Sequence, residues 1–297
     1  MLKQLLLLAC FCFAKASLAV GFDITIPEFP EDHAIQFDAL PSQQDDSLLQ
    51  QGSLLQGQAL LTNTESLIRQ SLKPKVILII DDLGDNYRLA KRIVDLPAKI
   101  NLAFLPNTPF AKKLAQQGYQ KGHDIMLHFP MEATTRPDLL GKGALTQQHS
   151  KEQAEQLFQA NLEQIPHVVG FNNHMGSLMT QSTEHMRWVM DYAAKRNLFF
   201  VDSKTIASSV AIEQALEQGI PTLGRDVFLD PVSDSITSEQ QLMHALSIAD
   251  KKGQVVVIGH PYRSTIELLE RELPYIARHY QLVTVSEYWQ STQKRMN

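Results

Sequence analysis

The sequence predicts an α/β fold in which a parallel sheet of seven or eight strands, wrapped by helices, closes into a barrel. Two observations carry this prediction. From Lys73 onward, apolar segments of strand length alternate with segments of helical pattern. Polar or ionisable clusters follow at least six of the predicted strands. A barrel gathers that many strand ends on one rim, whereas an open doubly wound sheet, the alternative, uses two or three at its switch point.

The clearest strand is Val76–Ile80, an apolar and mostly β-branched run typical of a strand buried on both faces. Seven further strands are predicted at residues 100–104, 124–128, 168–171, 198–202, 222–228, 255–258 and 281–285. A capping box from Ser150 to Gln153 opens a helix that ends before Pro166. Other helical patterns cover residues 180–196, 212–218, 238–251 and 264–275. Together they define a predicted barrel domain over residues 73–297.

Composition limits the classes of function. The chain has 297 residues, 44% of them hydrophobic, and a net charge of −5, so it can bury a substantial core. No basic stripe stands out, which argues against nucleic acid as a partner. The two cysteines, Cys10 and Cys12, both lie in the segment predicted below to be removed. A mature chain without thiols has no disulfide and no cysteine nucleophile, so a metal would be held by His, Asp and Glu.

Residues 1–19 are predicted to be a secretory signal peptide. Lys3 supplies the basic start, residues 5–13 form a short apolar run, and Ser17–Ala19 forms a small-x-small cleavage site. The expected location is therefore periplasmic or secreted, with no transmembrane segment after cleavage. An uncleaved membrane anchor is the alternative, but the apolar run is short for one.

Residues 20–72 differ in composition from the rest of the chain. An acidic part interrupted by prolines precedes a part rich in Gln, Ser and Leu. The leucines come in pairs with rough helical spacing, at Leu48, Leu49, Leu54, Leu55, Leu60, Leu61 and Leu67. This segment is predicted to be a flexible tether, with a docking segment for a cell-envelope protein as the alternative.

Asp81 and Asp82 follow the buried strand directly, and two adjacent carboxylates there repel each other and lose water. A metal ion or a catalytic role would compensate for that cost. His128 and Glu132 stand four residues apart across a bend at Pro130. With Asp82 and His174 they form a candidate set of metal ligands. Such N and O ligands suit Zn²⁺ best among divalent metals, with Mn²⁺, Co²⁺ and Fe²⁺ as alternatives.

This set of side chains predicts hydrolytic chemistry. Three protein ligands leave a coordination position at which water loses a proton near neutral pH and becomes a nucleophile. Asp81 is the candidate base for that proton, and His260, which arrives from a later strand, is the candidate acid for the leaving group.

Four motifs resemble the polysaccharide deacetylase superfamily, and more closely its divergent branch of secreted bacterial proteins. They are IDDLG (80–84), GHDIMLHFPME (122–132), GFNNHMGS (170–177) and IGHP (258–261). The resemblance implies a deformed seven-stranded (β/α) barrel, with Asp81 as base, Asp82 as a metal ligand and His260 as acid. It also implies metal-dependent removal of acetyl groups from a carbohydrate, for which envelope glycan such as peptidoglycan fits a secreted protein.

Two positions depart from the superfamily pattern. Glu132 stands where the second metal histidine is expected, so either Glu132 or His174 would complete the ligand set. The arginine that would orient the base is absent from its usual place, and Arg225 is the nearest candidate. Candidates for substrate contact or for support of the ligands are Asn173, Asp202, Arg225 and Asp226. The departures keep two alternatives open: an inactive barrel that binds glycan or an envelope partner, and a metal-free glycosidase that uses Asp81 with another carboxylate.

Overall fold

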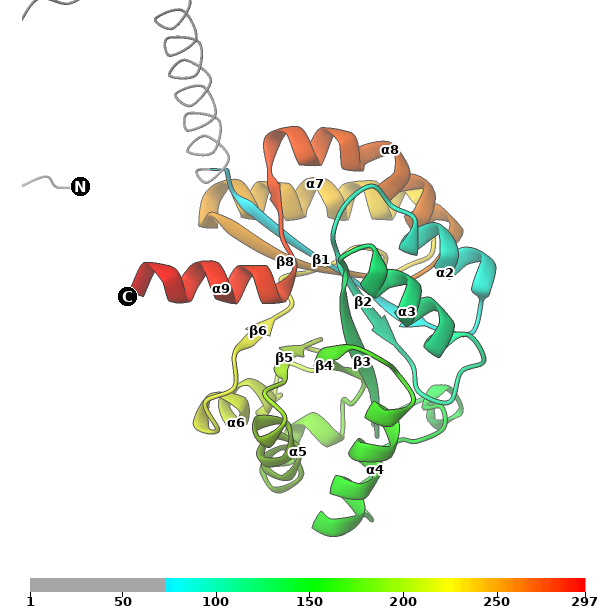
Figure 1. Cartoon of the computed structure of the whole chain (residues 1–297), viewed down its shortest axis with the longest axis vertical. Coiled ribbons are helices and arrows are strands. Elements are labelled where there is room, and N and C mark those ends of the chain that lie inside the picture. Colours follow the sequence, from blue (N-terminus) through cyan, green and yellow to red (C-terminus); the bar gives the residue numbers. More distant parts are fainter. Residues whose placement is uncertain (1–72, 297) are drawn as a thin grey trace, which may run out of the picture. The chain divides into compact units, whose positions relative to one another are not determined.

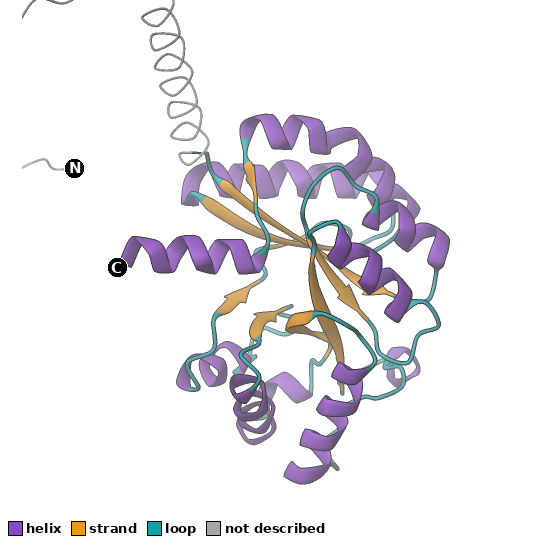
Figure 2. Ribbon diagram, in the orientation of Figure 1, coloured by secondary structure: helices purple, strands orange, loops and turns teal. Residues whose placement is uncertain are grey.

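The computed structural model describes residues 73–296, and in it a curled parallel sheet is covered by helices on its outer face (Figures 1 and 2). The predicted signal peptide and tether lie outside the described residues. The strands are β1 (Lys75–Leu83), β2 (Asn101–Phe104), β3 (Asp124–Met131), β4 (Val168–Met175), β5 (Phe199–Asp202), β6 (Thr222–Gly224), β7 (Val227–Phe228), β8 (Gln254–Gly259) and β9 (Gln281–Leu282).

The helices lie between the strands in the order expected of repeated βα units. They are α2 (Tyr87–Val94), α3 (Ala111–Gln120), η1 (Pro137–Leu139), α4 (Lys151–Glu163), η2 (Met179–Gln181), α5 (Thr183–Lys195), α6 (Ala211–Glu217), α7 (Ser235–Lys252), α8 (Arg263–His279) and α9 (Val285–Met296). The predicted capping box is present at the start of α4, where Ser150 and Gln153 exchange side-chain to backbone hydrogen bonds. None of the described helices has the length and hydropathy needed to cross a bilayer.

The predicted α/β barrel is confirmed as a curled, deformed sheet. Eight parallel strands follow the order β6-β5-β4-β3-β2-β1-β8-β7, and β9 pairs with the start of β1. The segment 222–228, predicted as one strand, is two. Among the described strands, β6 and β7 end the path and do not pair with each other. The barrel wall is therefore open along this seam.

Two residues carry the chain across the seam. The backbone N–H of Arg225 donates to Asp202 O at the end of β5, and that of Asp226 donates to Val256 O on β8. Adjacent residues are thus bonded to strands on opposite sides of the seam, β5 and β8. The predicted strand is broken because the chain changes from pairing with β5 to pairing with β8 at this point. No local sequence pattern predicts this change.

The strands bury both faces, which is why β1 reads as a continuous apolar run. Alternate residues of β1 face the helices, and the others, Ile77 and Ile79, face the barrel interior. The interior cluster also contains residues of other strands, of the segment before α9 and of the first position of α9, namely Ala103, Met126, Phe199, Val201, Val256, Ile258, Val283 and Val285. Tyr288 and Trp289 of α9 pack against this cluster. The carboxyl ends of the strands remain to form the candidate site.

Candidate metal centre

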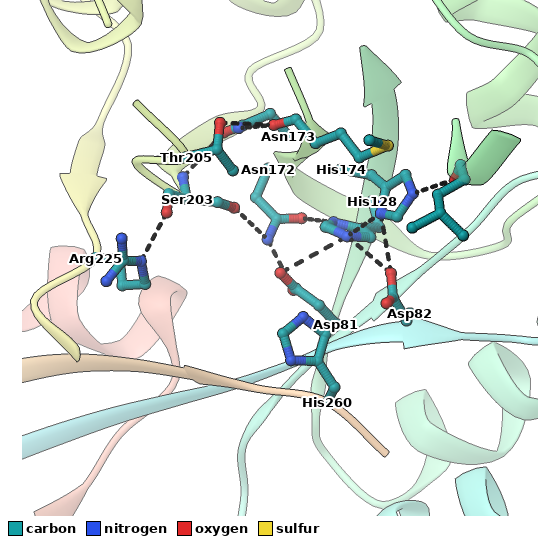
Figure 3. Close-up of polar contacts among 12 residues, drawn as sticks. Asp81, Asp82, His128, Asn172, Asn173, His174, Ser203, Thr205, Arg225 and His260 are labelled. Carbon is teal, nitrogen blue, oxygen red and sulfur yellow. Dashed lines mark hydrogen bonds and ion pairs between the residues drawn. The ribbon is translucent and has the colours of Figure 1, made fainter. Parts of the chain in front are cut away.

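A β-bulge at the end of β1 turns two adjacent carboxylates toward the same place. In a regular strand Asp81 and Asp82 would face opposite sides of the sheet. The pairing of β1 with β2 shifts register between Ile80 and Leu83, and Asp82 adopts a left-handed backbone with φ of 54°. As a result, Asp82 Oδ1 lies 3.2 Å and Asp81 Oδ2 3.7 Å from His128 Nε2 (Figure 3).

The neighbouring strands β3 and β4 supply the remaining groups. His128 is on β3, and Asn172 and His174 are two residues apart on β4, so both face the same side of the sheet. Their strand positions are paired in register, with His128 opposite Asn172 and Pro130 opposite His174. In the sheet, β2 lies between β1 and β3. It ends at Phe104, which pairs with Leu127, so β2 stops one residue before the level of His128.

Asp82, His128 and His174 form a group of ligand atoms that could hold a metal ion, all within 4.8 Å of one another. Asp82 Oδ1 lies 3.2 Å from His128 Nε2 and 3.0 Å from His174 Nδ1. The two imidazole nitrogens are 3.1 Å apart. A tetrahedral ion with bonds of about 2.1 Å separates its ligands by roughly 3.4 Å, so the triangle has the size that Zn²⁺ uses.

In each histidine, the nitrogen that points away from Asp82 has an acceptor as its hydrogen-bond partner, and this partner fixes which nitrogen carries the proton. Asp81 can only accept, so Asn172 presents its NH₂ to Asp81 Oδ1 at 2.8 Å and its carbonyl oxygen to His128 Nδ1 at 2.8 Å. Nδ1 of His128 is therefore the donor. Likewise Nε2 of His174 lies 3.1 Å from Leu139 O, a carbonyl acceptor. In the neutral imidazoles this leaves the lone pairs of His128 Nε2 and His174 Nδ1 facing Asp82, as for metal-binding histidines held by their outer partners.

A cation fits this arrangement on a structural ground. Asp82 Oδ1 is buried and has no hydrogen-bond partner among the described residues. A buried oxygen without a partner is costly, and three lone-pair-bearing atoms that face one another compound the cost. A divalent ion bound by Asp82, His128 and His174 would satisfy all three atoms at once. The donor set of two imidazoles and one carboxylate suits Zn²⁺ and related borderline ions.

The ionisable groups perturb one another strongly. Burial raises the pKa of the Asp81 carboxyl above its ordinary value, and the nearby imidazoles of His128 and His260 only partly offset this. Burial acts in the same direction on Asp82, but the imidazoles of His128 and His174 outweigh it and hold the pKa of Asp82 well below its usual range. Asp82 therefore stays ionised as a ligand should, while Asp81 is the better proton acceptor.

His260 approaches Asp81 from the other side of the site, at the end of β8 (Figure 3). Its Nδ1 lies 2.8 Å from Asp230 Oδ1, and its backbone N–H donates to Asp230 Oδ2 at 2.7 Å. Burial lowers the pKa of His260, but the hydrogen bond and charge of Asp230, with the charges of Asp81 and Asp82, outweigh it and raise the pKa to about 9. Nδ1 is committed to Asp230, so Nε2 is the atom left to act on a bound molecule.

Glu132 is not brought to the ligand group. It lies one residue beyond β3, where the chain pairs with the segment around Leu145. Its carboxylate accepts a hydrogen bond of 2.8 Å from the backbone N–H of Gln147. Of the two candidates for the third ligand, the geometry therefore favours His174.

Two other candidate residues, Asn173 and Asp202, form hydrogen bonds that hold the backbone near the site. Asn173, which faces away from His128, donates to Met175 O and accepts from the N–H of Ser203. Asp202 accepts from the N–H of Lys204 and from the hydroxyl of Ser209. Both hold the turn that follows β5.

Arg225 and Asp226 brace the seam. Arg225 donates to Ser203 O and Lys204 O, and its guanidinium lies 3.8 Å from the centre of the Phe228 ring. The carboxylate of Asp226 accepts from the N–H of Val256 at 2.9 Å. None of these contacts reaches Asp81, so the hydrogen-bond donor that orients Asp81 is Asn172 and not Arg225.

Sequence reasoning missed two residues as individual candidates, Asn172 and Asp230. Asn172 lies inside the motif at 170–177 but was not singled out. Asp230 follows the predicted strand 222–228, and the criterion used elsewhere, a carboxylate just past a strand, would have found it. Its side chain is fully buried and also accepts a hydrogen bond of 2.6 Å from Thr265.

A cavity of about 260 Å³ adjoins the ligand group on the side of His174. It is lined by polar and apolar groups from the loops at the carboxyl ends of the strands, including Asp85, Asn107, Leu139, Lys142 and His174. Of the ligand group, His174 is the one residue among those that line this cavity.

Two curated relatives are 32% identical to this chain. One is the uncharacterized protein YibQ of Escherichia coli, matched over 200 residues that make up 67% of this chain and 62% of the relative. The other is an uncharacterized protein of Haemophilus influenzae, matched over 73% of this chain and 77% of its own length. The chain thus spans less than two thirds of the E. coli relative.

The fold is similar to the crystal structure of the uncharacterized protein ATU2773 from Agrobacterium tumefaciens. The TM-score is 0.68 at 22% identity, over 72% of this chain and 88% of that one. The family model described as divergent polysaccharide deacetylase matches residues 78–289, a range that runs from within β1 into the first half of α9 and contains every residue of the ligand group. The chain belongs to the divergent polysaccharide deacetylase family.

Proposed function

We propose that this protein is a metal-dependent hydrolase that removes acetyl groups from a carbohydrate. The observation that carries the proposal is the ligand triangle of Asp82, His128 and His174, with Asp81 beside it and His260 on the far side of Asp81. A buried carboxylate and a partly buried imidazole next to a metal-binding group are typical of a site that moves protons.

Each residue has a role in the proposed reaction. A divalent cation, Zn²⁺ by preference, would supply the positive charge that lowers the pKa of water and polarises a carbonyl group. Asp81 accepts the proton that the attacking water loses, and Asn172 holds Asp81 in place through its 2.8 Å hydrogen bond. Nε2 of His260 donates a proton to the departing amine or alkoxide, while Asp230 fixes the ring through Nδ1.

We place the substrate in the cell envelope. Membership in the deacetylase family supports an acetylated glycan, and peptidoglycan is the candidate that suits a periplasmic or secreted protein. The location itself rests on the signal-like residues 1–19, which lie outside the described part of the chain.

The first test measures metal content by mass spectrometry on protein purified without an affinity tag. We expect about one Zn²⁺ or similar ion per chain, lost in Asp82→Asn, His128→Ala and His174→Ala and retained in Glu132→Gln. The loaded protein is then assayed for acetate release from acetylated glycans, with and without a chelator. Absence of metal after reconstitution would overturn the proposal, and activity that survives chelation would point to the glycosidase alternative.

The rival is a non-catalytic barrel that binds glycan or an envelope partner. The departures at Glu132 and at the arginine position favour it. Bound metal without acetate release from any glycan, together with glycan binding that Asp81→Asn leaves unchanged, would support the rival.

A further inference from the structure

Helices α7 and α8 lie side by side on the outer face of the sheet and enclose a groove remote from the ligand group (Figure 1). We call it the α7–α8 groove. Its volume is about 530 Å³. Leu242 and Leu246 of α7 and Leu268 of α8 line it, and Met243, Tyr275 and Tyr280 flank them.

The groove is apolar at a surface position where a helix normally presents polar side chains. Met243 is 72% exposed and Tyr275 is 48% exposed. Ile236, two helical turns before Met243 on the same side of α7, is 68% exposed. Exposed apolar residues that adjoin a groove mark a surface that another segment covers.

The described chain begins at one end of this groove. The N–H of Lys75 donates to Gly253 O, just past the carboxyl end of α7. The side chain of Lys73 donates to Arg278 O in the last turn of α8 at 2.6 Å. Lys73 therefore lies near the carboxyl ends of α7 and α8, where Asp250 and Tyr280 line the groove.

The residues that precede this point have a pattern that complements the groove. Between 60 and 72, apolar residues stand at Leu60, Leu61, Leu67, Ile68 and Leu72. At 100° per residue they cover one side of a helix, with Asn63, Ser66 and Gln70 opposite. Thirteen helical residues span about 20 Å, and the part of α7 from 239 to 250 that lines the groove spans about 17 Å.

We propose that residues 60–72 pack into the α7–α8 groove of their own chain as an amphipathic helix that runs parallel to α7 and α8. With equal rise per residue, Arg69 comes within about one turn of Asp250. These two side chains carry opposite charges. Because no linker separates the segment from the groove, the local concentration of the segment exceeds that of any free partner. The proposal does not depend on the proposed enzymatic function.

The first experiment uses disulfide trapping in the full chain, with Cys10→Ser and Cys12→Ser as background. The pair Ile68→Cys and Ser247→Cys is expected to form an intramolecular disulfide at least tenfold faster than the matched pair Gln70→Cys and Ser247→Cys, at a rate independent of dilution. Equal rates for the two pairs would overturn the proposal. A cross-linked dimer that forms faster than the intramolecular bond would overturn it in favour of a second copy.

The second experiment keeps the native side chains of the groove. The rate of Met243 oxidation by dilute peroxide, followed by peptide mass spectrometry, should rise several-fold in the variant Leu61→Asp/Ile68→Asp. It should stay unchanged in the control Asn63→Asp/Gln70→Asp, which adds the same charge to the opposite side of the helix. Equal Met243 oxidation in wild type and both variants would show that the groove is uncovered and would end the proposal.

Discussion

The rim of the barrel has two sides that differ in how their charges are satisfied. On the ligand side, Asp82, His128 and His174 crowd three acceptor atoms together and leave Asp82 Oδ1 without a hydrogen-bond partner. On the acid side, His260 and Asp230 satisfy each other through two hydrogen bonds. The ligand side has a buried oxygen that a cation would satisfy, whereas the groups of the acid side satisfy each other. Metal binding and proton donation should therefore respond to different substitutions.

The largest effect on turnover should come from Asp81→Asn, which lies between the two sides. The substitution removes the proton acceptor but keeps the shape and the contact with Asn172, so we expect acetate release to fall by about 10²–10⁴-fold. Metal content, measured on the same preparation, should stay near one ion per chain. Loss of the metal together with activity would mean that Asp81 is a ligand and that the two sides are not separate.

Asn172→Ala tests the ligand side through its outer partner. It removes the acceptor for His128 Nδ1 and the donor to Asp81, and such changes typically weaken metal affinity by about 10–100-fold. Competition with a chromophoric chelator measures this affinity. Asn173→Ala is the matched control, because the hydrogen bonds of that amide go to the backbone of Met175 and Ser203 and not to the ligand group. Equal losses in both variants would assign Asn172 a purely structural role.

Asp230→Asn tests the acid side through the pH profile. The pKa of His260 is raised to about 9, so the imidazole stays protonated until the pH rises through that value. Without the charge of Asp230, burial should bring the pKa to about 6.5 or below, and activity at pH 8 should fall by about 30-fold, with less than a twofold loss at pH 6. An alkaline limb that stays near pH 9 in the variant would exclude His260 as the acid.

The smallest effect is expected for Glu132→Gln. Glutamine can still accept the hydrogen bond from Gln147, so metal content and affinity should change by less than about twofold. A loss comparable to that of His174→Ala, measured by the same chelator competition, would mean that Glu132 swings into the ligand group when metal binds.

Most of the fold was predictable from sequence because its strands are buried on both faces and read as apolar runs. The identity of Asp82, His128 and His174 as neighbours also followed from a simple rule, since each stands at or near the carboxyl end of a strand. The same rule placed His260 on the rim. The positions of the strands, and the residues at their carboxyl ends, could therefore be predicted from local sequence patterns.

Other features depend on contacts between distant parts of the chain. The partnership of His260 with Asp230 spans 30 residues, and that of Asp81 with Asn172 spans 91. The split of 222–228 into β6 and β7 depends on Arg225 and Asp226 bonding to strands on opposite sides of the seam. Glu132 is withdrawn by a pairing with the segment around Leu145. No periodicity within one segment carries such information.

The left-handed backbone at Asp82 restricts which substitutions this position can accept. A φ of 54° is readily adopted by Gly, Asn and Asp, and at a cost by other side chains. Of these three only Asp offers an anionic ligand. A single replacement of Asp82 by Asn would keep the bulge, the barrel and the surrounding contacts while removing the negative charge from the metal-binding group. A metal-binding protein of this design thus lies one substitution away from a barrel of the same shape that binds without a metal.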